Sequence, residues 1–130
     1  MQINLSFPFP PVAKERARVT RFGAYTPART KEFQRMFQWH CRKMYVDNPL
    51  GVPLKVVLEF HMPKPKKSKF GYWPGVRPDI DNLSKAVMDA GNGILWKDDA
   101  LICALFCTKV YAPDKPKIRL TITTLLEELK

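Results

Sequence analysis

The segment Leu54–Met62 alternates apolar and polar side chains, and it constrains the fold more than any other part of the chain. The apolar set consists of Leu54, Val56, Leu58, Phe60 and Met62. Because successive side chains of a strand point to opposite faces, this pattern predicts a strand with one buried face. A chain built around such a strand must cover that face with helices or with a second sheet.

Weaker alternation predicts the remaining strands. Residues 2–8 form one candidate, and prolines 8, 10 and 11 end it. Residues 101–111 and 117–125 form two more, and the turn at residues 112–116 suggests that they make an antiparallel hairpin. Phe22-Gly23 offers a tight turn, so we expect a small hairpin over Arg18–Tyr25.

Two segments instead repeat apolar residues at spacings of three and four, which predicts helices. The first runs from Ala28 to about Tyr45, with Thr26 as its cap and Pro27 in its first turn. Its apolar face holds Phe33, Met36, Phe37, His40, Cys41 and Met44, and its polar face holds Arg29, Lys31, Arg35, Arg42 and Lys43. The second helix covers about Asp81–Ala90 and stops at Asn92-Gly93. We therefore expect a single small α/β (α+β) domain over residues 1–130, with a mixed or antiparallel sheet of about four to five strands flanked by helices.

Composition fits one intracellular domain. With 130 residues and 45 % hydrophobic side chains, the chain can bury a core of its own. An odd number of cysteines argues against a disulfide framework, so we expect Cys41, Cys103 and Cys107 to be reduced core residues. No apolar run approaches the length of a membrane span, and the first residues lack the pattern of a signal peptide. These features predict a cytoplasmic protein without a membrane partner.

The formal net charge of +10 indicates a polyanionic partner. Solubility alone would also explain a basic chain, but here the charge is clustered. One cluster covers Lys14–Arg21, and another lies in residues 63–78, where lysines alternate with prolines and aromatic residues without any period. We expect this second segment to be a mobile loop.

Acidic residues are scarce, yet several fall between positions 79 and 99. In an extended stretch Asp79 and Asp81 would leave the same face, and Asp81 is the expected cap of the second helix. Asp99 or Asp98 can supply a third carboxylate. Convergent carboxylates suit Mg²⁺, which prefers hard oxygen ligands and a substrate phosphate. Lys85, one helical turn after Asp81, could then stabilise charge on that phosphate. The pattern is typical of metal-assisted phosphodiester hydrolysis.

Each of these residues also has a purely structural explanation. Asp81 alone is more often a helix cap. The pair of Asp81 and Lys85 is more often an exposed ion pair, and Asp98-Asp99 alone usually forms a turn. Asp89 fits a solvated helical position, and we leave it out of the site. His40 and His61 have no second histidine at ligand spacing and are expected to be structural. Together, beside basic segments, the carboxylates favour the metal site.

At these residues the chain resembles the RusA-like Holliday junction resolvases, which also occur in phages. The matching pattern is Asp79-x-Asp81-Asn82-Leu83-x-Lys85 followed by Asp89-Ala90-x-Asn92-Gly93-x-Leu95-Trp96-x-Asp98-Asp99. Pro10-Pro11, the Arg16/Arg18 stretch and Tyr25-Thr26-Pro27 are also similar, so the likeness covers nearly the whole chain.

The resemblance implies a magnesium-dependent endodeoxyribonuclease that cuts four-way junctions in recombination and repair as a symmetric homodimer, with Mn²⁺ as a substitute metal. Asp79, Asp81 and Asp99 would bind the metal, Lys85 would be the catalytic lysine, and Asn82 and Asp98 would support them. Residues expected to contact DNA are Lys14, Arg16, Arg18, Lys66, Lys67, Lys69 and Arg77.

Some alternatives remain open at this level. The aromatic residues Phe70, Tyr72 and Trp73 either stack on unpaired bases or cover the edge of the core. A non-catalytic DNA-binding module would explain the basic charge but not the carboxylates. A nuclease for flaps, nicks or RNA would have the same metal site. The sequence gives neither the base preference at the cut nor the number of metal ions.

Overall fold

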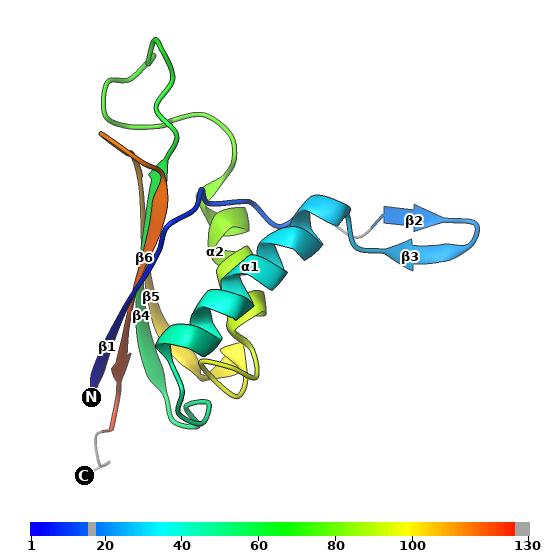
Figure 1. Ribbon diagram of the computed structural model, residues 1–130, viewed down its shortest axis with the longest axis vertical. Helices are drawn as coiled ribbons and strands as arrows, with labels where there is room; N and C mark the ends of the chain where they lie inside the picture. Colours follow the sequence, from blue (N-terminus) through cyan, green and yellow to red (C-terminus); the bar gives the residue numbers. More distant parts are fainter. Residues whose placement is uncertain (16–17, 127–130) are drawn as a thin grey trace.

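A four-stranded mixed sheet carries two helices on one of its faces (Figure 1), in agreement with the predicted α+β class. The computed structural model describes residues 1–15 and 18–126. In chain order the elements are β1 (Gln2–Phe7), β2 (Arg18–Thr20), β3 (Gly23–Tyr25), α1 (Ala28–Met44), β4 (Leu54–Met62), α2 (Ile80–Gly91), the 3₁₀ turn η1 (Asp99–Leu101), β5 (Ile102–Tyr111) and β6 (Lys117–Thr124). β2 and β3 form the predicted small hairpin, which projects beyond α1.

The strand order of the large sheet is β1-β6-β4-β5. β4 pairs with β6 in antiparallel and with β5 in parallel orientation. The predicted hairpin between β5 and β6 is therefore wrong, because β4 lies between them. Burial explains the order: five side chains of β4 and three of β6 are buried, whereas β5 exposes Leu105 and Phe106 and takes the edge. The link at residues 112–116 crosses the end of β4, where the Ala112 N–H donates to the Met62 carbonyl.

The core lies between the sheet and the two helices. The predicted face of β4 is buried from Leu54 to Met62, which confirms the alternation. Phe7 of β1 stacks on Phe37 of α1 with ring centroids 4.2 Å apart. Trp96 is fully buried and donates its indole N–H to the Met88 carbonyl at 3.2 Å. Neither of the two described α-helices covers the other face of the sheet (Figure 1).

Several predicted details at the helix ends and cysteines are corrected. α1 begins one residue after its N-cap Pro27 and has no side-chain cap, so Thr26 does not cap it. α2 begins at Ile80 with Asp79 as its N-cap, so Asp81 lies inside the first turn. Cys41 is buried, and burial raises the pKa of its thiol to about 12. Cys103 is exposed because it lies on the edge strand, although all three cysteines are free as expected.

The segment β4–α2–β5 places one end of the sheet beside the start of α2. Two parallel strands joined through a helix have their carboxyl ends on the same side of the sheet, and ligands of α/β proteins bind there. Residues 63–79 leave the carboxyl end of β4, contain no helix or strand, and lead to α2. Among the described helices, none combines the length and apolar character of a membrane span.

Candidate functional site

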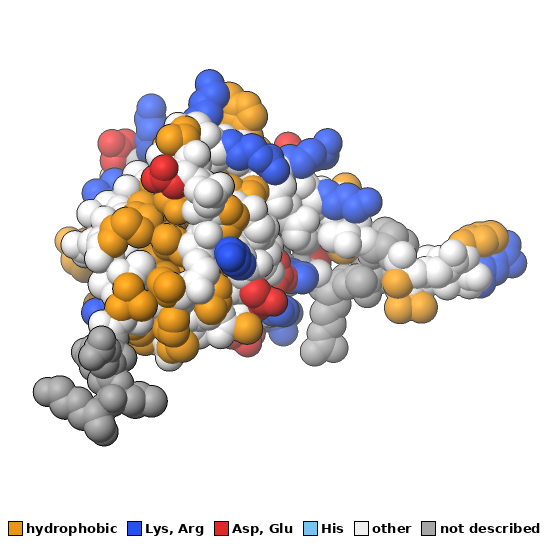
Figure 2. Space-filling model, turned by 90° about the horizontal axis from the view of Figure 1, so that it is seen from below, with side chains coloured by type: hydrophobic (Ala, Val, Ile, Leu, Met, Phe, Trp, Pro, Cys, Tyr) orange, Lys and Arg blue, Asp and Glu red, His pale blue; other side chains and the backbone are white. Residues whose placement is uncertain are grey.

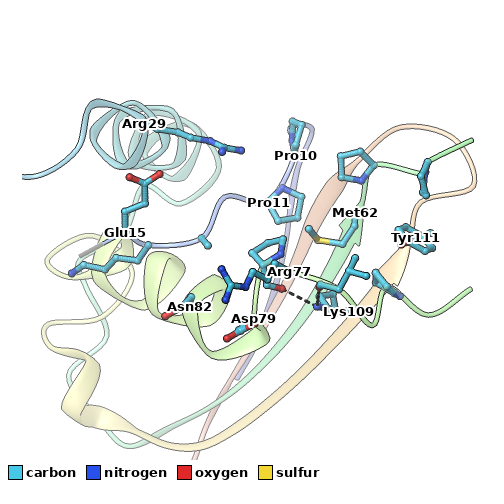
Figure 3. Close-up of a pocket in the computed structure, with 17 residues that line it drawn as sticks. Pro10, Pro11, Glu15, Arg29, Met62, Arg77, Asp79, Asn82, Lys109 and Tyr111 are labelled. Carbon is cyan, nitrogen blue, oxygen red and sulfur yellow. Dashed lines mark hydrogen bonds between the residues drawn. The ribbon is translucent and has the colours of Figure 1, made fainter. Parts of the chain in front are cut away.

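A cleft of about 990 Å³ lies at the carboxyl ends of β4 and β5 (Figure 3). Met62 and Tyr111, the last residues of these strands, line it together with the start of α2. Four basic residues and two acidic residues share its wall: Lys14, Arg29, Arg77, Lys109, Glu15 and Asp79. The cleft is therefore positively charged overall, with one carboxylate at the helix start.

Lys109 fixes the segment that precedes Asp79. Its ammonium donates hydrogen bonds to the carbonyls of Val76 and Pro78, both at 2.8 Å (Figure 3 shows the region). Lys109 stands on β5, which is anchored by its pairing with β4. The strand thus holds the backbone on which Arg77 and Asp79 stand. Arg77 and Asp79 are exposed and line the cleft together with Asn82.

One side of α2 carries charges that recur every four residues: Asp81, Lys85 and Asp89. Lys85 is 60 % exposed and its ammonium lies 3.7 Å from the Asp89 carboxylate. Lys14 also forms an ion pair with Asp89, and its backbone N–H donates to the Asn82 carbonyl at 3.0 Å. Asp89 is therefore not a solvated position as predicted, since two lysines share its carboxylate and only 17 % of its side chain is exposed.

Asp98 and Asp99 lie at the opposite end of α2. Asn92 is the C-cap of this helix, and its side-chain amide donates to the Asp99 carboxylate at 3.5 Å. Asp79, in contrast, is the N-cap of the same helix. The twelve residues of α2 make it about 18 Å long at about 1.5 Å per residue. Asp98 caps η1 by accepting the Ala100 N–H at 2.8 Å. Within one chain, Asp99 thus does not converge with Asp79 and Asp81.

A divalent cation fits part of the predicted ligand set. Asp79 and Asp81 are exposed, and neither forms an ion pair with a described lysine or arginine. Mg²⁺ is commonly held by one or two carboxylates together with water and substrate phosphate, which these two residues can provide. In the chain from 1 to 15 and 18 to 126, no three His, Cys, Asp or Glu side chains are placed to hold a metal.

The predicted basic loop borders the cleft. Pro63, Pro65 and Pro74 line the cleft, whereas Lys66, Lys67 and Lys69 are exposed. The Tyr111 N–H donates to the Tyr72 carbonyl at 3.2 Å and attaches the loop to β5. Phe70, Tyr72 and Trp73 expose 51 %, 81 % and 61 % of their surface. These aromatic side chains therefore do not serve to cover the core edge.

Two predicted DNA contacts fall on residues or side chains outside the described part of the chain. Arg16 lies outside the described residues, and the side chain of Arg18 is not described. Conversely, sequence reasoning missed Arg29 and Lys109 in the cleft. Arg29 was visible as a basic residue on the polar face of its helix. Lys109 gave no signal, because its role depends on pairing between distant segments.

Comparison with known proteins places the chain in a family. The family model for endodeoxyribonuclease RusA matches residues 8–123. The crossover junction endodeoxyribonuclease RusA of Escherichia coli O139:H28 is 28 % identical over 126 residues, covering 96 % of this chain and 97 % of the relative. The protein of that name from Escherichia coli K12 is 26 % identical with the same coverage. YqaN, an uncharacterized protein of Bacillus subtilis, is 28 % identical over 74 % of this chain and 75 % of its own. The chain belongs to the RusA endodeoxyribonuclease family.

Proposed function

We propose that this protein is a structure-selective endodeoxyribonuclease that resolves Holliday junctions in DNA recombination and repair by hydrolysing paired phosphodiester bonds. The observation that carries the proposal is the basic cleft at the carboxyl ends of β4 and β5, with Asp79 at its rim and Asp81 in the first turn of α2. Negative charge beside DNA weakens binding unless a cation neutralises it. A purely DNA-binding module would gain nothing from these carboxylates.

The residues of the cleft divide the work. Arg77 and Lys14 attract the phosphate backbone, and Lys109 keeps the Asp79 segment in place. Lys85 is held loosely enough by Asp89 to reach a phosphate beside Asp81 and to neutralise charge that develops there. The loop lysines 66, 67 and 69 hold a DNA arm, and the exposed aromatics of residues 70–73 stack on bases unpaired at the crossover.

Asp79 and Asp81 would hold a magnesium ion, for which Mn²⁺ can substitute. When bound, the ion makes an attacking water more acidic and neutralises charge on the phosphate. Asp79 is the N-cap of α2 and Asp99 lies beside its C-cap Asn92, so most of a helix about 18 Å long separates Asp99 from the other two. Its carboxylate would therefore join them from a second copy of the chain. This supports a homodimer, whose two-fold symmetry also matches the symmetry of a four-way junction.

The first test is cleavage of a labelled four-way junction beside linear duplex and a flap of the same sequence, with Mg²⁺ and with chelator. We expect paired symmetric cuts in the junction alone, and only with Mg²⁺. Equal cutting of the flap would assign the protein to a broader class of nucleases. Binding without cutting by folded protein would support the non-catalytic module.

Single substitutions test the metal ligands. Asp79→Asn removes a ligand charge, so cutting should be lost while junction binding stays equal or becomes tighter. Cutting at the wild-type rate would refute the assignment of Asp79.

A mixture of two inactive variants tests the shared site. If each site takes Asp79 from one chain and Asp99 from the other, a heterodimer of Asp79→Asn and Asp99→Asn chains contains one intact site. Refolding the two chains together should then restore nicking of one strand. If the mixture stays inactive although heterodimers form, each chain builds its site alone.

A further inference from the structure

The outward face of α1 carries a row of basic residues that the proposed chemistry does not use. We name this surface the α1 ridge; it consists of Trp39 and five basic residues, Arg29, Lys31, Arg35, Arg42 and Lys43. All six side chains are exposed. Lys and Arg side chains line the upper edge of Figure 2, the side on which α1 lies when the view of Figure 1 is turned.

An ordinary solvated helix face would mix charges of both signs. Such faces carry acidic and basic residues three or four positions apart, which stabilise each other. Here Glu32 is the single acidic residue of the helix, and no basic residue of the ridge forms an ion pair within residues 1–15 and 18–126. Lys31 and Arg35 are four apart and repel each other. A polyanion would relieve this repulsion.

Trp39 lies in the middle of these charges with 53 % of its surface exposed. The Lys43 ammonium lies 4.3 Å from the centre of its ring. A large aromatic ring beside cations, unpaired with the core, is suited to contact with a sugar or a base while the cations hold phosphates. The same combination recurs at the tip of the β2–β3 hairpin, where Arg21 lies over Phe22 at 4.8 Å.

The ridge continues the cleft. Arg29, in the first turn of α1, also lines the cleft that contains Asp79. From Arg29 to Lys43 the helix extends for about 21 Å at about 1.5 Å per residue. This length corresponds to roughly six base-pair steps at about 3.4 Å each.

We propose that the α1 ridge is a second DNA-binding surface, which holds the backbone of a duplex arm as it leaves the cleft. The proposal rests on the proposed function in one respect, that the cleft binds DNA. It does not depend on catalysis. Arg29 joins the two surfaces, Lys31, Arg35 and Arg42 contact phosphates, and Trp39 packs against a sugar or base.

The test compares two triple variants that lose the same charge. The ridge variant carries Lys31→Gln, Arg35→Gln and Arg42→Gln. The control carries Lys55→Gln, Lys115→Gln and Arg119→Gln, which lie on the sheet and its turn away from α1. Binding is measured against salt for junctions with short and long arms, in Ca²⁺ so that no DNA is cut. We expect the slope of log K against log salt to become shallower by about three in the ridge variant alone. We also expect the ridge variant alone to bind long-armed junctions no more tightly than short-armed ones.

Equal losses in both variants would overturn the proposal, since net charge would then explain them. Unchanged binding by the ridge variant would also overturn it and would leave the proposed nuclease intact. Failure of the wild-type protein to cut, with the difference between the variants preserved, would refute the nuclease and keep the ridge.

Fluorescence gives an independent readout. Trp96 is fully buried, so in a Trp73→Phe variant the quenching of fluorescence by acrylamide reports mainly on Trp39. Long-armed junction DNA should protect Trp39 from acrylamide, whereas a short-armed junction should not. Equal quenching with and without long-armed DNA would refute the contact.

Discussion

Replacing Lys109 with methionine should slow cutting much more than it weakens junction binding. The ammonium of Lys109 donates to the Val76 and Pro78 carbonyls at 2.8 Å. Methionine keeps an unbranched stem of similar size but has no donor, so the segment that carries Arg77 and Asp79 loses its attachment to β5. Asp79 would then spend less time in its working position.

The magnitude follows from the two lost bonds. Hydrogen bonds to charged groups contribute about 1.5–3 kcal/mol each, and water replaces part of this at the rim of the cleft. A net loss of about 2 kcal/mol in the free energy that holds the segment in place lowers the ratio of ordered to displaced segment about 30-fold, because about 1.4 kcal/mol corresponds to a factor of ten. We therefore expect the single-turnover cutting rate to fall about 30-fold, with a higher Mg²⁺ concentration at half-maximal rate. The dissociation constant for the junction in Ca²⁺ should rise much less than the cutting rate falls, because the other cations of the cleft, Lys14, Arg29 and Arg77, remain.

Two variants make the result specific. Lys115→Met removes the same charge from an exposed turn and should cut at the wild-type rate. Lys109→Arg can still donate to both carbonyls and should recover part of the activity. If Lys109→Met cut like wild type with the same Mg²⁺ dependence, the positioning role would be refuted. If it lost overall stability to urea, Lys109 would be a general structural residue instead.

Three further predictions concern the loop, the core and pH. Alanine in place of the loop residues Lys66, Lys67 and Lys69 should make the slope of log K for junction binding against log salt shallower by up to about three; an unchanged slope would exclude phosphate contacts there. Gly91→Ala should destabilise the protein by about 1–3 kcal/mol in urea unfolding, because the new Cβ would lie 2.6 Å from the ring of fully buried Trp96; an unchanged midpoint would show that the ring can move. Burial lowers the pKa of His61 below 6.5, and nearby Lys117 and Arg119 add to this against the effect of Glu59. The unfolded chain then takes up the proton first, so stability should fall as pH drops below about 6.5 and fall less in His61→Phe; equal acid sensitivity would contradict this.

The sequence predicted local structure well because local structure depends on periodicity. The alternation in β4 and the apolar spacing of α1 and α2 gave three elements whose bounds the structure confirms closely. Periodicity shows which face of a strand is buried but not which strand lies beside it. The order β1-β6-β4-β5 was therefore missed, because it depends on which strands bury most surface.

The same limit applies to the candidate site. Asp79, Asn82 and Arg77 are close in sequence, and the structure places all three at the cleft. Asp99 follows soon after in the chain, yet α2 carries the backbone from one end of the sheet to the other before Asp99 begins η1. Sequence proximity across a helix thus gave no information about spatial proximity.

The position of β6 has a consequence for how the protein is made. β6 is the last of the described strands in sequence order, but it lies inside the sheet, where β1 pairs with it from Gln2 to Phe7. A ribosome releases the chain amino end first, so β1 has no strand partner, and one side of β4 stays unpaired, until residues 117–124 emerge. Strands that are distant in sequence pair slowly. Until they pair, their unpaired edges can bind other chains. Shortening the chain into β6 would therefore remove the centre of the sheet rather than trim an edge, and we expect such truncated chains to aggregate.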